Sequence, residues 1–352
     1  MRQNRKLVRI RHSIEGERAR LLRPRTKALR TRTAAQLAAA TLLAALCTAL
    51  AAPPSVAEQG SAEALVTSQI AETVTFVNVD TMQVTGQVSI PGKPAGIALS
   101  PDRKTAYVTA PEARVLAVID IESRTVIDRL AVGNGPLGVA VHPQDGRIFV
   151  ADWYDHRIAV IDPSTRAVTA YIPVGESPSG IAITPDGRLV LSADRDSHQV
   201  SLIDAATLTV IGTVPVGERP FGITIDADGR FAYTANVKSN DVSIIDIAAG
   251  RTVATIAVGK RPYAVALAAG RAFVTDQYSE TVSVIDLDKK AVVKAVKVGA
   301  YPEGIAAGRN GRFVYVACWE DNTLERIDAQ TLEITGRIEV PDGPRAFGDF
   351  LR

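Results

Sequence analysis

Aromatic and arginine side chains recur at positions of this sequence where they could bind a ligand together. The two tryptophans, Trp153 and Trp319, each lie nine residues before a repeated aspartate, and several other members flank repeated prolines. Aromatic faces with guanidinium donors suit a ring-bearing or anionic organic ligand, or a hot spot for a peptide. The alternative is that the rings pack between neighbouring loops. The candidate ligand-binding residues are Trp153, Tyr154, Arg219, Phe221, Asn236, Arg261, Tyr263, Tyr278, Tyr301, Glu303, Trp319 and Arg345.

Carboxylates and imidazoles form a second set, with the chemistry of a divalent metal site. His156 and His198 occupy equivalent positions 42 residues apart, and aspartates accompany each of them. No close His-x-His or Cys-x-x-Cys spacing is present, so solvated loop residues are the alternative. The candidate metal ligands are Asp152, His156, Asp194, His198 and Asp276. A divalent metal is the one cofactor that the pattern admits, and no other is predicted.

The sequence offers no complete catalytic set. Cys318 lies beside Trp319 without a histidine in its own loop, whereas a nucleophilic thiol needs a neighbouring base. We therefore expect Cys318 to be a small buried residue. There is no serine nucleophile motif and no glycine-rich phosphate loop. Catalytic residues are left unassigned, and binding is favoured over catalysis.

These residues belong to a repeat that must position them. Marker prolines at 94, 136, 178, 220, 262, 302 and 344 are 42 residues apart, except for one spacing of 40. The same register recovers aspartates at 80, 120, 162, 204, 246, 286 and 328. Each aspartate precedes a turn, where a carboxylate accepts hydrogen bonds from nearby backbone N–H groups. We interpret these aspartates as structural.

Each unit reads as four short strands. In the unit that begins at Pro178, segments rich in Val, Ile, Ser and Thr alternate with turn residues such as Pro185-Asp186-Gly187. Four strands in about 42 residues match one propeller blade. The sequence predicts an all-β fold, a seven-bladed propeller of four-stranded antiparallel blades. Its units start near 94, 136, 178, 220, 262 and 302 within a domain spanning 58–352.

The ends of the domain complete the ring. Residues 62–91 supply three strands and residues 344–352 supply one, so together they predict a composite closing blade. Closure removes two exposed sheet edges. Deletion of residues 344–352 is therefore expected to open the ring.

The segments Tyr107-Val108-Thr109 and Ala232-Tyr233-Thr234-Ala235-Asn236 make the chain similar to the YVTN-repeat β-propellers. This resemblance implies that the loops entering the innermost strands and those joining the second and third strands line one face around a central channel. The candidate residues lie in these loops. Trp153 and Trp319 fall on blades three and seven, which would place them across the channel from each other.

Residues 1–57 have the composition of a targeting segment. They carry 12 Lys and Arg against two acidic residues, followed by an Ala/Leu-rich run from Ala34 to Ala52 and a small-x-small site at Ser55-Val56-Ala57. An uncleaved membrane anchor with its long basic region is the alternative, and it would be the chain's membrane contact. The chain is expected to be exported, to the periplasm, the cell surface or the medium.

The net charge of the domain restricts which classes of partner it can bind. Of the 40 basic and 38 acidic residues, 28 and 36 lie beyond residue 57, which gives that part a formal charge of −8. Generic nucleic-acid binding is not expected, because it needs a basic footprint. We expect a monomer that binds a protein, a glycan or a small anionic or aromatic ligand at one loop face. The alternatives are a hydrolase or lyase similar to the lactonase propellers, and an accessory subunit of a periplasmic redox enzyme.

Overall fold

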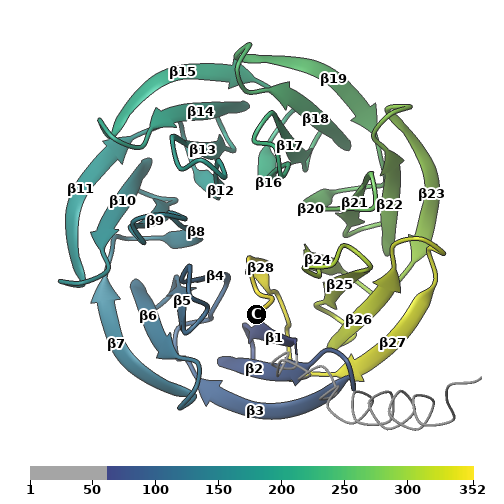
Figure 1. Cartoon of the computed structure of the whole chain (residues 1–352), viewed down its shortest axis with the longest axis horizontal. Coiled ribbons are helices and arrows are strands. Elements are labelled where there is room, and N and C mark those ends of the chain that lie inside the picture. The colour runs from purple at the N-terminus through teal and green to yellow at the C-terminus, as the bar shows by residue number, and fades with distance from the viewer. Residues whose placement is uncertain (1–61) are drawn as a thin grey trace, which may run out of the picture. The chain divides into compact units, whose positions relative to one another are not determined.

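A computed structural model describes residues 62–352, which form seven β-sheets around a common centre (Figure 1). The innermost strands are β4 (Gly96–Leu99), β8 (Pro136–Val141), β12 (Pro178–Ile183), β16 (Pro220–Ile225), β20 (Pro262–Ala268), β24 (Pro302–Ala307) and β28 (Phe347–Gly348). The second strands are β1 (Glu63–Ser68), β5 (Thr105–Ala110), β9 (Ile148–Asp152), β13 (Leu189–Asp194), β17 (Phe231–Asn236), β21 (Arg271–Asp276) and β25 (Phe313–Cys318).

The third strands are β2 (Thr73–Asn78), β6 (Val115–Asp120), β10 (Arg157–Asp162), β14 (Gln199–Asp204), β18 (Asp241–Asp246), β22 (Thr281–Asp286) and β26 (Thr323–Asp328). The outermost are β3 (Gln83–Ser89), β7 (Thr125–Ala131), β11 (Ala167–Pro173), β15 (Thr209–Pro215), β19 (Arg251–Ala257), β23 (Ala291–Lys297) and β27 (Ile334–Glu339). Within each blade, successive strands pair antiparallel. The predicted seven-bladed propeller is confirmed.

Burial explains the composition of each strand. The four central residues of β14, Val200–Ile203, are buried because both sheet faces pack on neighbouring blades. The outermost strand β7 instead alternates exposed and half-buried residues, since one face meets solvent. The hydrophobic clusters accordingly run between adjacent blades; one of them joins Leu191 and Val200 of one blade to Ile245 of the next.

The closing blade combines both ends of the described chain, as predicted. Ser68 forms a β-bridge with Pro344, and Ala64 forms one with Leu351. Between these bridges the segment shifts inward, and Phe347 pairs parallel with Gly96 of β4. Figure 1 shows β28 beside the innermost strands, with the C-terminus near β1. The last strand therefore contacts two blades and joins the first to the second.

Two details of the repeat differ between units. The turn position held by Asp120 and its equivalents is occupied in the first blade by Asn78, and not by Asp80 as the marker series suggested. Asn78 Oδ1 accepts hydrogen bonds from two backbone N–H groups in this turn, as the aspartates do. The 40-residue spacing arises because β20 and β21 are joined by a two-residue turn, Ala269-Gly270. Both residues have positive φ, which suits a tight hairpin turn.

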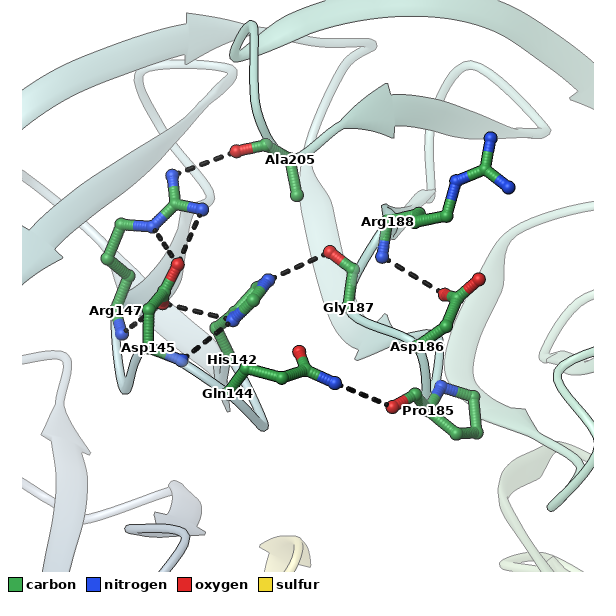
Figure 2. A network of polar contacts seen from close by, with 9 residues as sticks. All are labelled: His142, Gln144, Asp145, Arg147, Pro185, Asp186, Gly187, Arg188 and Ala205. Atoms are coloured by element: carbon green, nitrogen blue, oxygen red, sulfur yellow. Dashed lines mark hydrogen bonds and ion pairs between the residues drawn. The ribbon is translucent and has the colours of Figure 1, made fainter.

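Side chains also join blades at their turns. His142 follows β8, and its Nδ1 accepts a hydrogen bond from the Asp145 N–H, which leaves Nε2–H to donate to the Gly187 carbonyl of the next blade at 2.8 Å. Gln144 donates to the Pro185 carbonyl at 3.0 Å (Figure 2). These bonds fix two neighbouring turns relative to each other.

The predicted targeting segment, residues 1–57, lies outside the described residues. Within the described part of the chain, no helix is long and apolar enough to span a membrane.

Candidate functional site

A cavity of 360 Å³ opens among the loops that were expected to line one face of the propeller. Three repeat positions supply its walls. The residue directly after the second strand contributes Gln69, Trp153, Arg195, Val237, Gln277 and Trp319. The residues directly before and after the marker proline contribute Arg261 and Tyr301, and Phe221, Tyr263, Glu303 and Arg345. The repeat therefore builds this site by presenting equivalent positions from different blades.

Aromatic rings form two groups around the cavity. Phe221 is the centre of the first group, with ring centroids 4.3 Å from Tyr263 and 6.3 Å from Trp153. The second group is a row in which Tyr301 lies 5.6 Å from Tyr278 and 5.9 Å from Trp319. These separations are those of favourable tilted aromatic pairs. The rings therefore pack on one another, and all of those named except Tyr278 also line the cavity.

The first group extends to the C-terminal strand β28. Phe221 and Tyr263 contact Phe347 of β28, at centroid distances of 5.1 and 5.7 Å. All three rings are buried. Phe347 lines a different cavity, described below. Contacts among the three rings thus connect the linings of the two cavities.

Positive charge dominates the walls. Arg195, Arg261 and Arg345 face a single lining carboxylate, Glu303, which leaves a formal excess of two positive charges. Arg195 is paired with Asp196 at 2.7 Å. Arg345 is paired with Glu303 at 3.2 Å. Of the three guanidiniums, Arg261 is the one for which no carboxylate lies within ion-pair distance in the described chain.

Arg261 is held in place by neutral groups. Its Nε donates to Gln277 Oε1 at 2.6 Å, and its Nη1 donates to the Tyr278 hydroxyl at 2.9 Å. Gln277 in turn donates to Glu303 Oε1 at 2.8 Å. A chain of hydrogen bonds and one ion pair therefore runs from Arg261 to Arg345. Such a network holds the guanidinium in one orientation before any ligand arrives.

Glu303 and Arg345 lie deep in this network. Burial raises the pKa of the Glu303 carboxyl, while the Arg345 and Arg261 guanidiniums act to lower it. Arg345 also donates to the Tyr263 hydroxyl, and burial raises the pKa of that phenol. Because Arg345 is hydrogen-bonded to Tyr263 and ion-paired with Glu303, these groups define the shape of the wall more than they offer free ligand contacts.

Eight of the twelve candidate ligand-binding residues line the cavity and four do not. Asn236 is fully buried and donates to Asp241 and Ser243, so it holds its own blade together. Arg219 lies 3.5 Å from Asp196, outside the cavity. Tyr154 and Tyr278 are 69% and 57% exposed, which places them at the surface of this face. Tyr278 still contributes indirectly, because its hydroxyl orients Arg261.

The candidate metal ligands have structural partners. Asp152, Asp194 and Asp276 are fully buried at the ends of second strands. Asp152 Oδ1 accepts a hydrogen bond from the Gly135 N–H at 2.8 Å, and Asp194 accepts two from Ser192 and Ser201 at 2.7 and 2.6 Å. In these residues the carboxylate fixes the loop above its own blade.

The two histidines join adjacent blades. His156 Nδ1 accepts a hydrogen bond from the Ser177 N–H, and His198 Nδ1 accepts one from the Arg219 N–H, both at 3.0 Å. Asn240 accepts the equivalent bond from the Arg261 N–H at 2.8 Å. Across residues 62–352, no three His, Cys, Asp or Glu side chains are grouped so that they could hold a metal ion.

Comparison with known families identifies the propeller type. A family model described as YNCE-like beta-propeller matches residues 45–147 and 182–272, segments of 103 and 91 residues that cover more than half of the 352. The chain belongs to the YNCE-like beta-propeller family. The resemblance to YVTN-repeat propellers is therefore confirmed. An NHL repeat model also matches residues 134–161, and a comparison with curated proteins gave no match.

Solved structures share the fold of this YNCE-like propeller. A functionally unknown protein from Desulfotomaculum acetoxidans matches with a TM-score of 0.70 at 19% identity, covering 82% of this chain and 99% of that one. Hydrazine synthase of Kuenenia stuttgartiensis matches with 0.64 at 19%, covering 74% and 90%. Dihydro-heme d1 dehydrogenase NirN in complex with DHE matches with 0.62 at 15%, covering 81% and 74%. At these identities the likeness concerns the fold alone.

Four lining residues of this YNCE-like propeller are not among the candidates: Gln69, Arg195, Val237 and Gln277. They hold the same repeat position as Trp153 and Trp319 in other blades. Taking the residue at this repeat position in every blade as a candidate would have found them, because a propeller arranges equivalent residues in a ring.

Proposed function

We propose that this protein is a binding module that holds a small aromatic organic anion in the loop-face cavity. The observation that carries the proposal is the pairing of Arg261, a guanidinium without a carboxylate partner, with a wall of aromatic rings in one 360 Å³ cavity. Arginine binds carboxylates through directional, charge-assisted hydrogen bonds. Flat rings offer stacking surfaces at the same site.

Size and charge narrow the class of ligand. A cavity of 360 Å³ is near the lower end of the range for small-molecule sites, so it favours a compact ligand over an oligosaccharide. Net positive charge at the walls favours an anion. The exposed Tyr154 and Tyr278 at this face are the feature that supports a protein partner instead. We give the small anion precedence because the charged and aromatic groups converge inside the cavity.

The test compares benzoate with benzamide by isothermal titration calorimetry. The two differ in charge but hardly in shape, so a guanidinium-directed site should bind benzoate about 10- to 100-fold more tightly, corresponding to ~1.5–3 kcal/mol for a charged hydrogen-bonded pair. Arg261→Gln should remove this difference, whereas Arg251→Gln, at an exposed arginine of the outermost strand β19, should preserve it. Equal affinity for the two compounds in the unmodified protein would rule out the proposed recognition.

The proposal places this binding outside the cytoplasm. The basic stretch and apolar run before residue 58 support export. An accessory role beside a periplasmic redox enzyme is the second candidate. Its support is that two of the matched structures are a hydrazine synthase and a dihydro-heme d1 dehydrogenase, which share the fold with this chain.

A further inference from the structure

A second cavity, of 720 Å³, lies toward the C-terminal ends of the innermost strands. It is separated from the loop-face cavity by aromatic rings: Phe347 lines the second cavity, while its contacts Phe221 and Tyr263 line the first. A ligand in one cavity therefore does not occupy the other. None of the candidate ligand-binding residues lines this second cavity.

Aliphatic side chains and the backbone of the innermost strands form its walls. The fourth residue after each marker proline is small, as in Ala98, Ala140 and Ala306, and leaves open space inside the ring of strands. The next residue along is larger in most blades, as in Val141 and Ile183, and is partly exposed to the cavity. Such a surface gains free energy when an apolar group displaces water from it.

The lining side chains offer no net charge and few free polar groups. Arg103 and Asp349 are its two charged residues, and they form an ion pair at 2.5 Å. Thr224 donates its hydroxyl hydrogen to the Val265 carbonyl at 2.6 Å. Gly138 and its equivalents can offer only backbone atoms. The lining thus has no net charge, whereas positive charge is in excess at the loop-face cavity. Burial of a charged ligand here would cost more than burial of a neutral one.

Hydrogen bonds hold part of the mouth of the cavity in place before any ligand binds. Pro143 and Pro185, which line it, belong to the two turns that the His142–Gly187 and Gln144–Pro185 hydrogen bonds join (Figure 2). Arg147 adds a bond to the Ala205 carbonyl at 2.8 Å. A rim ordered by such bonds lowers the entropic cost of binding.

From these observations we infer that the second cavity binds a neutral aliphatic chain. Its aliphatic side chains, zero net lining charge and internally paired polar side chains match that chemistry, and its volume lies within the range of small-molecule sites. The site is independent of the loop-face cavity and of the function proposed for it.

The experiment is calorimetric titration of the full chain with 1-octanol, octanoate and octyltrimethylammonium. We expect saturable binding of 1-octanol and at least tenfold weaker binding of both charged compounds. The double variant Ala140→Phe/Ala306→Phe places two rings in the cavity and should weaken binding at least tenfold. Ala249→Phe, at an exposed turn residue, should retain it, and so should Arg261→Gln, because that residue belongs to the other cavity.

Three results would overturn the inference: no saturable binding of 1-octanol, binding of the charged compounds as tight as that of the alcohol, or unchanged binding in the double variant. Circular dichroism and the melting temperature establish that the double variant is folded. If it is not, the single variant Ala140→Phe serves, with a smaller but measurable loss of affinity expected and unchanged affinity contradicting the inference.

Discussion

At the scale of single residues, the repeated carboxylates at the ends of second strands hold loops in place. Burial also shifts the pKa of such a carboxylate. Burial raises the pKa of Asp276 to about 6, against the hydrogen bonds from Ser283 and Thr281 that lower it. The unfolded chain titrates this group near 3.8. Between these values the folded protein binds more protons than the unfolded chain. The stability that this group contributes is therefore present below about pH 4 and lost as the pH rises through 6.

Substitution of Asp276 by Asn tests this reasoning, since Asn236 already occupies the equivalent position of the preceding blade. Removing the buried charge should stabilise the protein above pH 6 by about 1–3 kcal/mol and have little effect near pH 4. Urea unfolding at pH 4.5 and 7.5 measures the difference. Identical pH profiles for the variant and the original protein would show that the carboxylate is not destabilised by burial.

Sequence reasoning at this scale found eight of the twelve cavity residues that the structure places together. It could not separate Arg261 from Arg219, because each directly precedes a marker proline. The two arginines also share a backbone conformation, with φ of 56° and 60°. Their neighbours decide the difference: Gln277 and Tyr278 hold Arg261, whereas Asp196 attracts Arg219. Contacts of this kind depend on the adjacent loop and are not encoded in the spacing.

At the scale of a blade, the seventh blade differs from the others at two positions of the repeat. Cys318 stands where other blades carry Asp194 or Asp276, and Glu325 stands where they carry serine. Glu325 Oε1 accepts a hydrogen bond from the Gly299 N–H at 3.1 Å and pairs with Arg337 at 2.5 Å. The carboxylate has thus moved from the second strand to the third while still holding the same loop.

This exchange predicts strong coupling between the two positions. Cys318→Asp alone should destabilise the protein by about 3–5 kcal/mol, because it places a second carboxylate beside the buried Glu325. Cys318→Asp combined with Glu325→Ser restores the pattern of the other blades and should recover most of that loss. Urea unfolding of both single variants and the double variant gives the coupling energy. Additive effects would mean that the two positions do not exchange roles.

The blade scale is also where the sequence was most informative. The period, the four strands and the composite blade follow from alternating β-branched residues and turn residues, which are local signals. The two-residue hairpin at Ala269-Gly270 and the shift from Asp80 to Asn78 were not predicted, since both depend on the pairing register of consecutive strands, which the spacing of the marker residues does not fix.

At the scale of the whole molecule, the segment from Pro344 to Arg352 closes the ring and contributes to both cavities. It supplies Arg345 to the loop face and Phe347 and Asp349 to the second cavity. Phe350 is fully buried, and its carbonyl accepts a hydrogen bond from the Leu65 N–H at 2.8 Å. Closure and binding therefore depend on the same nine residues.

Phe350→Ala should destabilise the protein by about 3–5 kcal/mol, because it leaves a cavity at the seam between the two ends of the propeller. The neighbouring Arg352→Ala is a matched control: that residue is exposed and lies 3.8 Å from Glu63, so its loss should cost less than about 1 kcal/mol. Urea unfolding measures both. A small effect of Phe350→Ala would show that the ring does not rely on this seam.

Intrinsic fluorescence tests the central claim most directly, because both tryptophans of the chain line the loop-face cavity. Titration with benzoate should change the tryptophan emission saturably, with the midpoint given by calorimetry. Benzamide should require at least tenfold higher concentrations, and Arg261→Gln should remove the preference for benzoate. Emission that stays constant throughout the benzoate titration, or an equal response in Arg261→Gln, would contradict anion binding at this cavity.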